Sequence, residues 1–225
     1  MYTLSAELTA LGQDLDDINN VYWTQLALTQ WINQGLVTIA RKAECLLGTS
    51  SVPASTNQSQ YPLPPDLVRV HEVTFSPNDP TQIYPLTFKG RQEMNTIWYI
   101  NQTTPASYPI YYTTWAQPPV TWMQVYPVPA QPGNFTYLYY RLPRTAVLTT
   151  DTLDIPDGYE DVLRAFVRYN ARRRAGDPIW QDDMTIFQDG LSDLITNSRN
   201  WTDNAGMFTT GGVFVPGWLY GGWGS

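Results

Sequence analysis

The sequence predicts an α+β fold: N- and C-terminal helices packed as a small bundle, an inserted antiparallel β-sandwich or barrel-like module, and an extended C-terminal arm. Two helical patterns, near the start of the chain and after residue 157, enclose a proline-rich region of short apolar runs. Each helical pattern has one apolar face that cannot be buried alone, so we expect the two patterns to pack together. The predicted divisions are helices at 1–50, a β-rich domain at 51–155, helices at 156–200 and an arm at 201–225.

The first helical pattern runs from about residue 24 to residue 47. Its apolar residues recur at three- and four-residue steps, as on one face of a long helix: Leu28, Trp31, Ile32, Leu36, Ile39, Ala43 and Leu46. Gly48 and the polar run that follows it predict the end of this helix and then a loop. A shorter helix is expected within the first dozen residues.

The middle region, from about residue 60 to residue 150, contains short runs of β-branched and aromatic residues separated by Pro, Gly, Asn and Asp. This pattern is typical of antiparallel strands. We expect "VTWMQVYP" and "FTYLYYRL" to form a hairpin around "PVPAQPGN", and the aromatic residues of this stretch could form either a binding surface or a scaffold. One break in the strand pattern, "GRQEMNTIWY", predicts a helix of two turns.

Helical periodicity returns after Asp157, where Pro156 and Asp157 give a start signal. Gly176 is expected to end this helix, and Asp177 with Pro178 to begin the next. The apolar face of the first helix comprises Tyr159, Val162, Leu163, Phe166 and Val167. That of the second comprises Trp180, Met184, Phe187, Leu191, Leu194 and Ser198.

The C-terminal tail combines glycines with aromatic residues that are costly to leave in water. Such a strip predicts an arm that becomes ordered on a partner, and the alternative is an arm that folds back on its own domain. The residues expected to anchor it are Phe214, Trp218, Tyr220 and Trp223.

The composition favours a component of an assembly. Charged residues make up only 15% of the 225 residues, while Trp (9) and Tyr (15), which are common at partly buried surfaces, are frequent. The formal net charge of −7 argues against broad electrostatic attraction to nucleic acid. No apolar run approaches the length of a membrane span, and the N-terminus lacks the pattern of a signal peptide, so we expect a protein made in a cytoplasm without membrane contact.

Residues that could support catalysis or bind a cofactor are few. His71 is the only histidine and lies in a strand pattern, and Cys45 is the only cysteine, expected to be buried and inert. No phosphate-binding loop, nucleophile elbow or calcium-binding loop is present. We therefore predict no enzyme activity, no cofactor and no metal site. The acidic residues that a hydrolase could use are Asp14, Asp16, Asp17, Asp182 and Asp183.

The strongest charge feature is a row of arginines along one predicted helix. Arginine pairs well with carboxylates, and cations are favourable near a helix C-terminus, so we expect this row to contact a neighbouring subunit. The alternative is contact with phosphate. The residues are Arg164, Arg168, Arg172, Arg173 and Arg174.

Several segments, taken in order, carry a resemblance that covers most of residues 20–195. They are "LTQWINQGLVTIARK" with its Trp-x-Asn element, "YPLPPDLVRVHEV", "LTFKGRQEMNTIW", "TTPASYPIYYTTW", "VYPVPAQPGNFTYLYYRLPRTAV" and "LDIPDGYEDVLRAFVRYNARRRAGD". Together they resemble the head-to-tail adaptor proteins of tailed bacteriophages, including the tail tubular protein A type of podoviruses. Thr104 stands where many relatives have glycine, and the arm has no counterpart.

The resemblance implies a homo-oligomeric ring, a dodecamer, docked beneath the portal protein in the neck of the virion. Its helical part would meet the portal, and its β part the next tail or nozzle protein. Duplex DNA would pass through an acidic lumen without sequence-specific binding, and the aromatic middle stretch would be scaffold. The alternatives are another phage neck or tail component, a module that binds glycans through exposed aromatic residues, and a carboxylate hydrolase.

Overall fold

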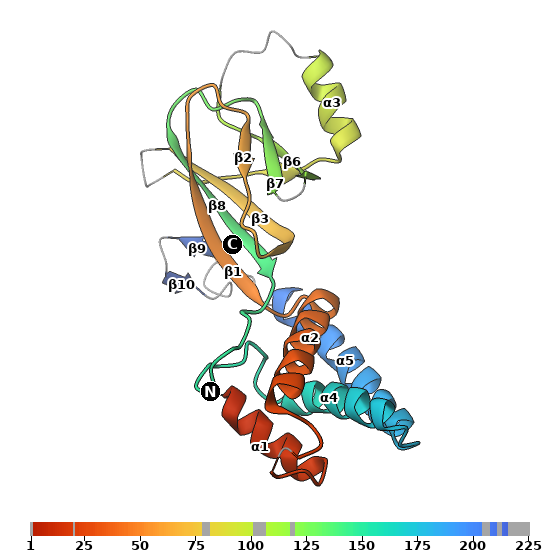
Figure 1. The fold of residues 1–225 in the computed structure, drawn as a ribbon. Helices are drawn as coiled ribbons and strands as arrows, with labels where there is room; N and C mark the ends of the chain where they lie inside the picture. Colours follow the sequence, from red (N-terminus) through yellow and green to blue (C-terminus); the bar gives the residue numbers. More distant parts are fainter. Residues whose placement is uncertain are drawn as a thin grey trace, which may run out of the picture. The chain divides into compact units, whose positions relative to one another are not determined.

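The computed structural model describes residues 2–19, 21–77, 82–100, 107–117, 120–203, 208–210 and 213–215. The chain forms two compact units, which we call the helical unit (residues 1–45 and 143–225) and the sheet unit (residues 46–142) (Figure 1). The predicted α+β class, with helices and a sheet module, is confirmed. The predicted four-part division of the chain stays a prediction.

The helical unit contains α1 (Leu4–Asp14), α2 (Gln25–Ala43), α4 (Glu160–Ala175) and α5 (Trp180–Asp203). Their apolar faces meet in one core, as the periodicity predicted. Its fully buried side chains include Leu4, Leu11, Leu28, Ile32, Leu36, Leu163, Val167 and Leu194.

Local signals explain where these helices begin and end. The Thr24 hydroxyl accepts a hydrogen bond from the Ala27 N–H at the start of α2, and Gly176 ends α4 with a φ of 75°. Glu44, with a φ of 48°, ends α2 four residues before Gly48. The predicted extension of this helix to residue 47 is therefore wrong.

The sheet unit buries a core between two sheets, whose strand orders are β1-β8-β3-β4 and β2-β7-β6-β5. Every described pair within them is antiparallel except β5 with β6. The predicted short helix is α3 (Arg91–Ile100). The strands are β1 (Leu47–Ala54), β2 (Gln60–Pro62), β3 (Leu67–Pro77), β4 (Tyr84–Pro85), β5 (Thr87–Phe88), β6 (Tyr111–Gln117), β7 (Val120–Tyr126) and β8 (Gly133–Arg141).

Two predictions about this region are wrong. The segment after Gly48 was predicted as a loop, but residues 49–54 belong to β1, whose eight residues all pair with β8. Residues 55–59 connect β1 to β2. The predicted hairpin of β7 and β8 does not form, because β7 pairs with β2 and β6 whereas β8 pairs with β1 and β3. Pro127, Pro129 and Pro132 lie between β7 and β8, and residues without an N–H cannot continue a ladder.

Five of the six aromatic residues between Trp122 and Arg144 are buried and act as scaffold, and the sixth, Trp122, is half-buried. The side chains of Tyr126, Phe135, Tyr137, Tyr139 and Tyr140 are each exposed by 6% or less, so they fill the sheet unit and present no open surface. The Phe135 ring packs at 4.7 Å from Tyr61 and 5.1 Å from Phe75, centroid to centroid, which joins strands from both sheets.

The C-terminal segment contains β9 (Phe208–Thr210) and β10 (Val213–Val215), which pair antiparallel with each other. Phe214 lies in β10, opposite Thr209. The other predicted anchors of the arm, Trp218, Tyr220 and Trp223, lie outside the described residues.

Gly133 offers a test of packing in the sheet unit. A Cβ at this position would lie 2.4 Å from the Ser76 carbonyl oxygen and 2.9 Å from the Phe75 ring, so Gly133→Ala forces backbone to move. We expect a loss of about 1–3 kcal/mol in the free energy of unfolding, measured by urea denaturation. Gly90→Ala is the matched control, because a Cβ there meets nothing within 4 Å. Equal stability of the two variants would contradict the packing described.

Candidate functional site

The predicted arginine row lies on one side of α4, because residues four apart on a helix share a face. Arg164, Arg168 and Arg172 are half-buried, with 21–23% of each side chain exposed. Their guanidinium groups reach carboxylates on α1 and α5, and the resulting cluster is called here the arginine network.

Asp183, in the first turn of α5, lies at the centre of the arginine network. Its side chain is only 3% exposed and accepts hydrogen bonds from Arg168 Nε at 3.0 Å and Arg172 Nη1 at 2.8 Å. Arg168 Nη1 also donates to Asp14 Oδ2 of α1 at 2.9 Å, and Arg172 Nη2 donates to the Asp14 carbonyl at 3.4 Å. Two arginines therefore join α1, α4 and α5 through charge-assisted hydrogen bonds.

Arg164 forms the second part of the network. It pairs with Asp161 at 3.1 Å and lies 3.5 Å from Glu7 Oε2, and it donates to the Tyr2 hydroxyl at 2.8 Å. The Tyr2 hydroxyl in turn donates to the Glu7 carboxylate. Glu7 is fully buried, and this burial raises the pKa of its carboxyl above its ordinary value, although Tyr2 and Arg164 act in the opposite direction.

The carboxylates that these three arginines contact belong to their own chain. The contact with a neighbouring subunit stays a prediction for all five arginines. Arg173 and Arg174 are exposed at the end of α4, where Arg173 donates to the Tyr169 hydroxyl at 2.7 Å. Arg174 lines a hollow of about 330 Å³ together with Tyr22, Trp23, Thr24 and Ala27.

Asn33 holds a long connection in place and was not singled out as a functional residue from the sequence. Its Nδ2 donates to the Ala146 carbonyl at 2.9 Å, and its Oδ1 accepts from the Ala146 N–H at 2.9 Å. The segment after β8 also pairs with the N-terminus, since the Leu4 N–H donates to the Asp151 carbonyl and the Leu153 N–H to the Tyr2 carbonyl. The Trp-x-Asn element noted in the sequence was the available signal.

Three of the five aspartates considered for catalysis or calcium have structural contacts: Asp14, Asp17 and Asp183. Asp17 accepts hydrogen bonds from the N–H groups of Val21, Tyr22 and Trp23, which orders the connection between α1 and α2. These N–H groups, Trp23 first, lower the pKa of its carboxyl. Asp14 and Asp183 belong to the arginine network, and Asp182 is exposed. Across the described ranges, no three His, Cys, Asp or Glu side chains are grouped to hold a metal ion.

His71 and Cys45 lie apart from any such cluster. His71 is exposed on β3 and contacts the Tyr140 ring edge-on at 5.7 Å. Cys45 is half-buried, and burial raises the pKa of its thiol to about 11, which keeps it protonated and unreactive near neutral pH.

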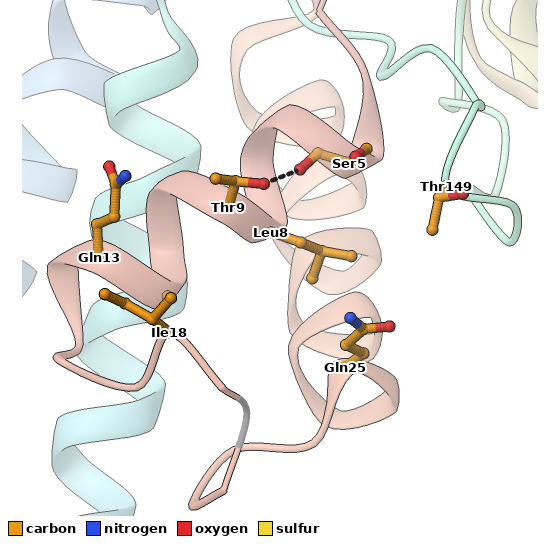
Figure 2. Close-up of a pocket in the computed structure, with 8 residues that line it drawn as sticks. Ser5, Leu8, Thr9, Gln13, Ile18, Gln25 and Thr149 are labelled. Carbon is orange, nitrogen blue, oxygen red and sulfur yellow. Dashed lines mark hydrogen bonds between the residues drawn. The ribbon is translucent and has the colours of Figure 1, made fainter.

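A hollow of about 210 Å³ opens on the helical unit. Figure 2 shows that its lining comes from α1, from the connection after α1, from the start of α2 and from the loop at Thr149. Ile18 on its rim is 73% exposed, and Val21 and Leu26, nearby in the chain, are at least 70% exposed. None of its lining residues is charged, but most of them are polar: Ser5, Thr9, Gln13, Gln25 and Thr149. The apolar surface lies beside the hollow, at Ile18, Val21 and Leu26, and exposed apolar side chains of this size suit a protein partner.

A family model described as SU10 adaptor protein matches residues 2–217 of the chain. No curated protein matches the chain. None of the helices in the described part of the chain is both long enough and apolar enough to cross a bilayer.

Asp183→Asn tests the centre of the arginine network. The substitution keeps the shape but removes the charge that Arg168 and Arg172 share, so we expect a loss of about 1.5–3 kcal/mol in the free energy of unfolding. Asp182→Asn is the matched control, because the neighbouring carboxylate is exposed. Urea denaturation of both variants measures the difference, and equal midpoints would contradict the role given to Asp183.

Glu7→Gln tests the buried carboxyl. Because the folded-state pKa is raised, the stability that protonated Glu7 provides is present below its ordinary pKa and is lost as the pH rises through the raised value. The stability of the variant relative to the wild type should therefore increase as the pH rises above the ordinary range of a glutamate carboxyl, because only the wild type has a carboxyl to ionise there. Urea midpoints of the variant and the wild type, measured at a series of pH values, give this difference in stability, and Glu72→Gln, at an exposed position, is the control. A difference independent of pH would contradict the raised pKa.

Proposed function

The chain belongs to the SU10 adaptor protein family, and from this premise we propose that it forms a ring beneath the portal of a tailed phage. The ring joins the capsid to the tail and gives DNA a passage. The likeness to tail tubular protein A of podoviruses, and with it twelvefold symmetry, is part of this proposal.

The single observation that carries the proposal is the extent of the family match. Residues 2–217 include both the helical unit and the sheet unit, so the likeness concerns the whole arrangement and not one common motif. The family indicates a phage head–tail adaptor, which is a structural component of the virion.

Each unit provides a surface suited to a protein partner. The helical unit exposes Ile18, Val21 and Leu26, and the sheet unit exposes Phe88 and Tyr99. Exposed apolar side chains of this size are typical of interaction sites. In the proposal, the helical unit meets the portal protein and the sheet unit meets the next tail or nozzle protein.

A closed ring also needs a head-to-tail contact between neighbouring copies, in which two different surfaces of each copy are used. Arg173 and Arg174, exposed at the end of α4, supply the charged part of that contact. Arg164, Arg168 and Arg172 act indirectly, because they hold the helical unit together. The anchors of the arm, Phe214, Trp218, Tyr220 and Trp223, contact a partner.

The net charge of −7 suits a passage for DNA that must not adhere to its walls. Phosphate groups are repelled by an acidic lumen, and binding through many lysines and arginines, which makes DNA adhere, is avoided. Duplex DNA is therefore a passing cargo in this proposal and is not recognised by sequence.

Electron microscopy of the virion tests the proposal. We expect a ring of this protein between portal and tail, with an opening wide enough for duplex DNA. Copies found on the outer surface of the capsid or tail would overturn it, and the exposed aromatic residues would then be tested for glycan binding.

Charge reversal separates the two groups of arginines in the same experiment. Arg173→Glu with Arg174→Glu should leave the isolated protein folded but remove the ring from the particles. Arg168→Glu should instead unfold the helical unit, because it faces Asp14 and Asp183. Rings that form normally with both exposed arginines reversed would exclude them from the subunit interface.

A further inference from the structure

Among the strands that the structure describes, one long sheet edge of the sheet unit has no strand paired to it. β1, with eight residues, is the outermost strand of its sheet, whereas β2, β4 and β5, the other outermost strands, have two or three residues each. Proteins usually protect a sheet edge by keeping it short or by placing charged residues on it. β1 has the sequence LGTSSVPA, so it is long and uncharged, and its one protecting residue is Pro53, next to its last residue.

The direction of the free backbone groups follows from the ladder. The Arg141 N–H donates to the Leu46 carbonyl at 2.9 Å, and in an antiparallel ladder the residues of a strand point alternately toward and away from their partner strand. The even-numbered residues of β1 therefore face β8. Leu47, Thr49 and Ser51 direct their N–H and carbonyl groups outward, and Pro53, which has no N–H, occupies an outward position at no cost to the ladder.

The described residues also include a two-stranded sheet, formed by β9 and β10 alone. β9 and β10 have three residues each and, within the ranges that the structure describes, pair only with each other. A two-stranded hairpin of this length is marginally stable in water, and a further strand is what it needs. Its strands, FTT and VFV, are β-branched or aromatic at every position and uncharged, which favours pairing with a neutral edge.

We infer that the β9–β10 hairpin of one copy adds to the outer edge of β1 in a neighbouring copy. This inference rests on the proposed ring and names the partner of the arm. Each copy has one open edge and one unpaired hairpin, so the numbers match in a ring of any symmetry. Each copy gives one contact and receives another, which is the head-to-tail arrangement that closes a ring. Main-chain hydrogen bonds supply the affinity, as in strand addition generally.

Cross-linking in assembled particles tests the contact. In a Cys45→Ser background, one variant carries Thr49→Cys on β1 and a second carries Thr209→Cys on β9, so each chain has a single thiol. Both are supplied together to phage lacking the native protein, and particles are treated with a short bismaleimide. We expect a covalent dimer of one variant with the other. Thr96→Cys, on the exposed side of α3, replaces Thr49→Cys in the control and should give none.

Thr49→Pro is the second test. Thr49 directs its N–H away from β8, so proline there should leave the urea midpoint of the isolated protein unchanged, as Pro53 is already accommodated. For this test, Ser51→Cys replaces Thr49→Cys as the thiol on β1. Thr49→Pro in the same chain should abolish its cross-link to Thr209→Cys of the other variant and reduce the number of particles that carry a ring.

The outcomes distinguish this inference from the proposed function. If rings form without the cross-link and are unaffected by Thr49→Pro, the inference is overturned and the proposed function as a ring still stands. The inference is also overturned if the Thr209→Cys thiol reacts only with the portal or a tail protein. The same holds if the Thr49→Cys thiol reacts only with the Thr49→Cys thiol of another copy. Virions in which the wild-type protein forms no ring overturn the proposed function and this inference together.

Discussion

The packing of the helical unit depends on half-buried arginine–carboxylate pairs, which fix how its helices are aligned with one another. Its two parts, residues 1–45 and 143–225, are separated in the chain by the whole sheet unit. Apolar burial drives them together but is non-directional, so it does not fix which turn of one helix faces which turn of another. Arg168 with Asp14 fixes α1 along α4, and Asp183 fixes α5. Leaving one of these charges without its partner is costly, which disfavours other registers.

This internal use of arginine has a consequence for the surface. The chain has 13 lysines and arginines against 20 aspartates and glutamates, and three of the arginines are half-buried in the network. These three side chains are therefore not free to bind a partner. The carboxylates of Glu7, Asp14 and Asp183 are taken up together with these arginines, so the network removes charges of both signs from the surface.

Sequence reasoning succeeded where the signal was local. The apolar faces of α2, α4 and α5, the end of α4 at Gly176 and the row of arginines all follow from spacing within one helix. The partners of the row could not be predicted, because Asp14 lies 154 residues from Arg168 and no periodicity connects them. The same holds for Asn33 and Ala146, which are 113 residues apart. Side chains that join distant segments become visible only once the fold has brought them together.

The failures share a different cause. The sequence of β1 predicts a loop because Gly, Ser and Pro weaken its strand signal. The sequences of β7 and β8 predict a hairpin because nothing in them specifies which strands pair with each. Strand preference is largely a property of the neighbours that a segment packs against. β1 is defined by β8 on one side only, and β9 and β10 by each other. β1 lies at a sheet edge, and β9 and β10 pair only with each other among the described residues, which is the ground for the contact proposed between neighbouring copies.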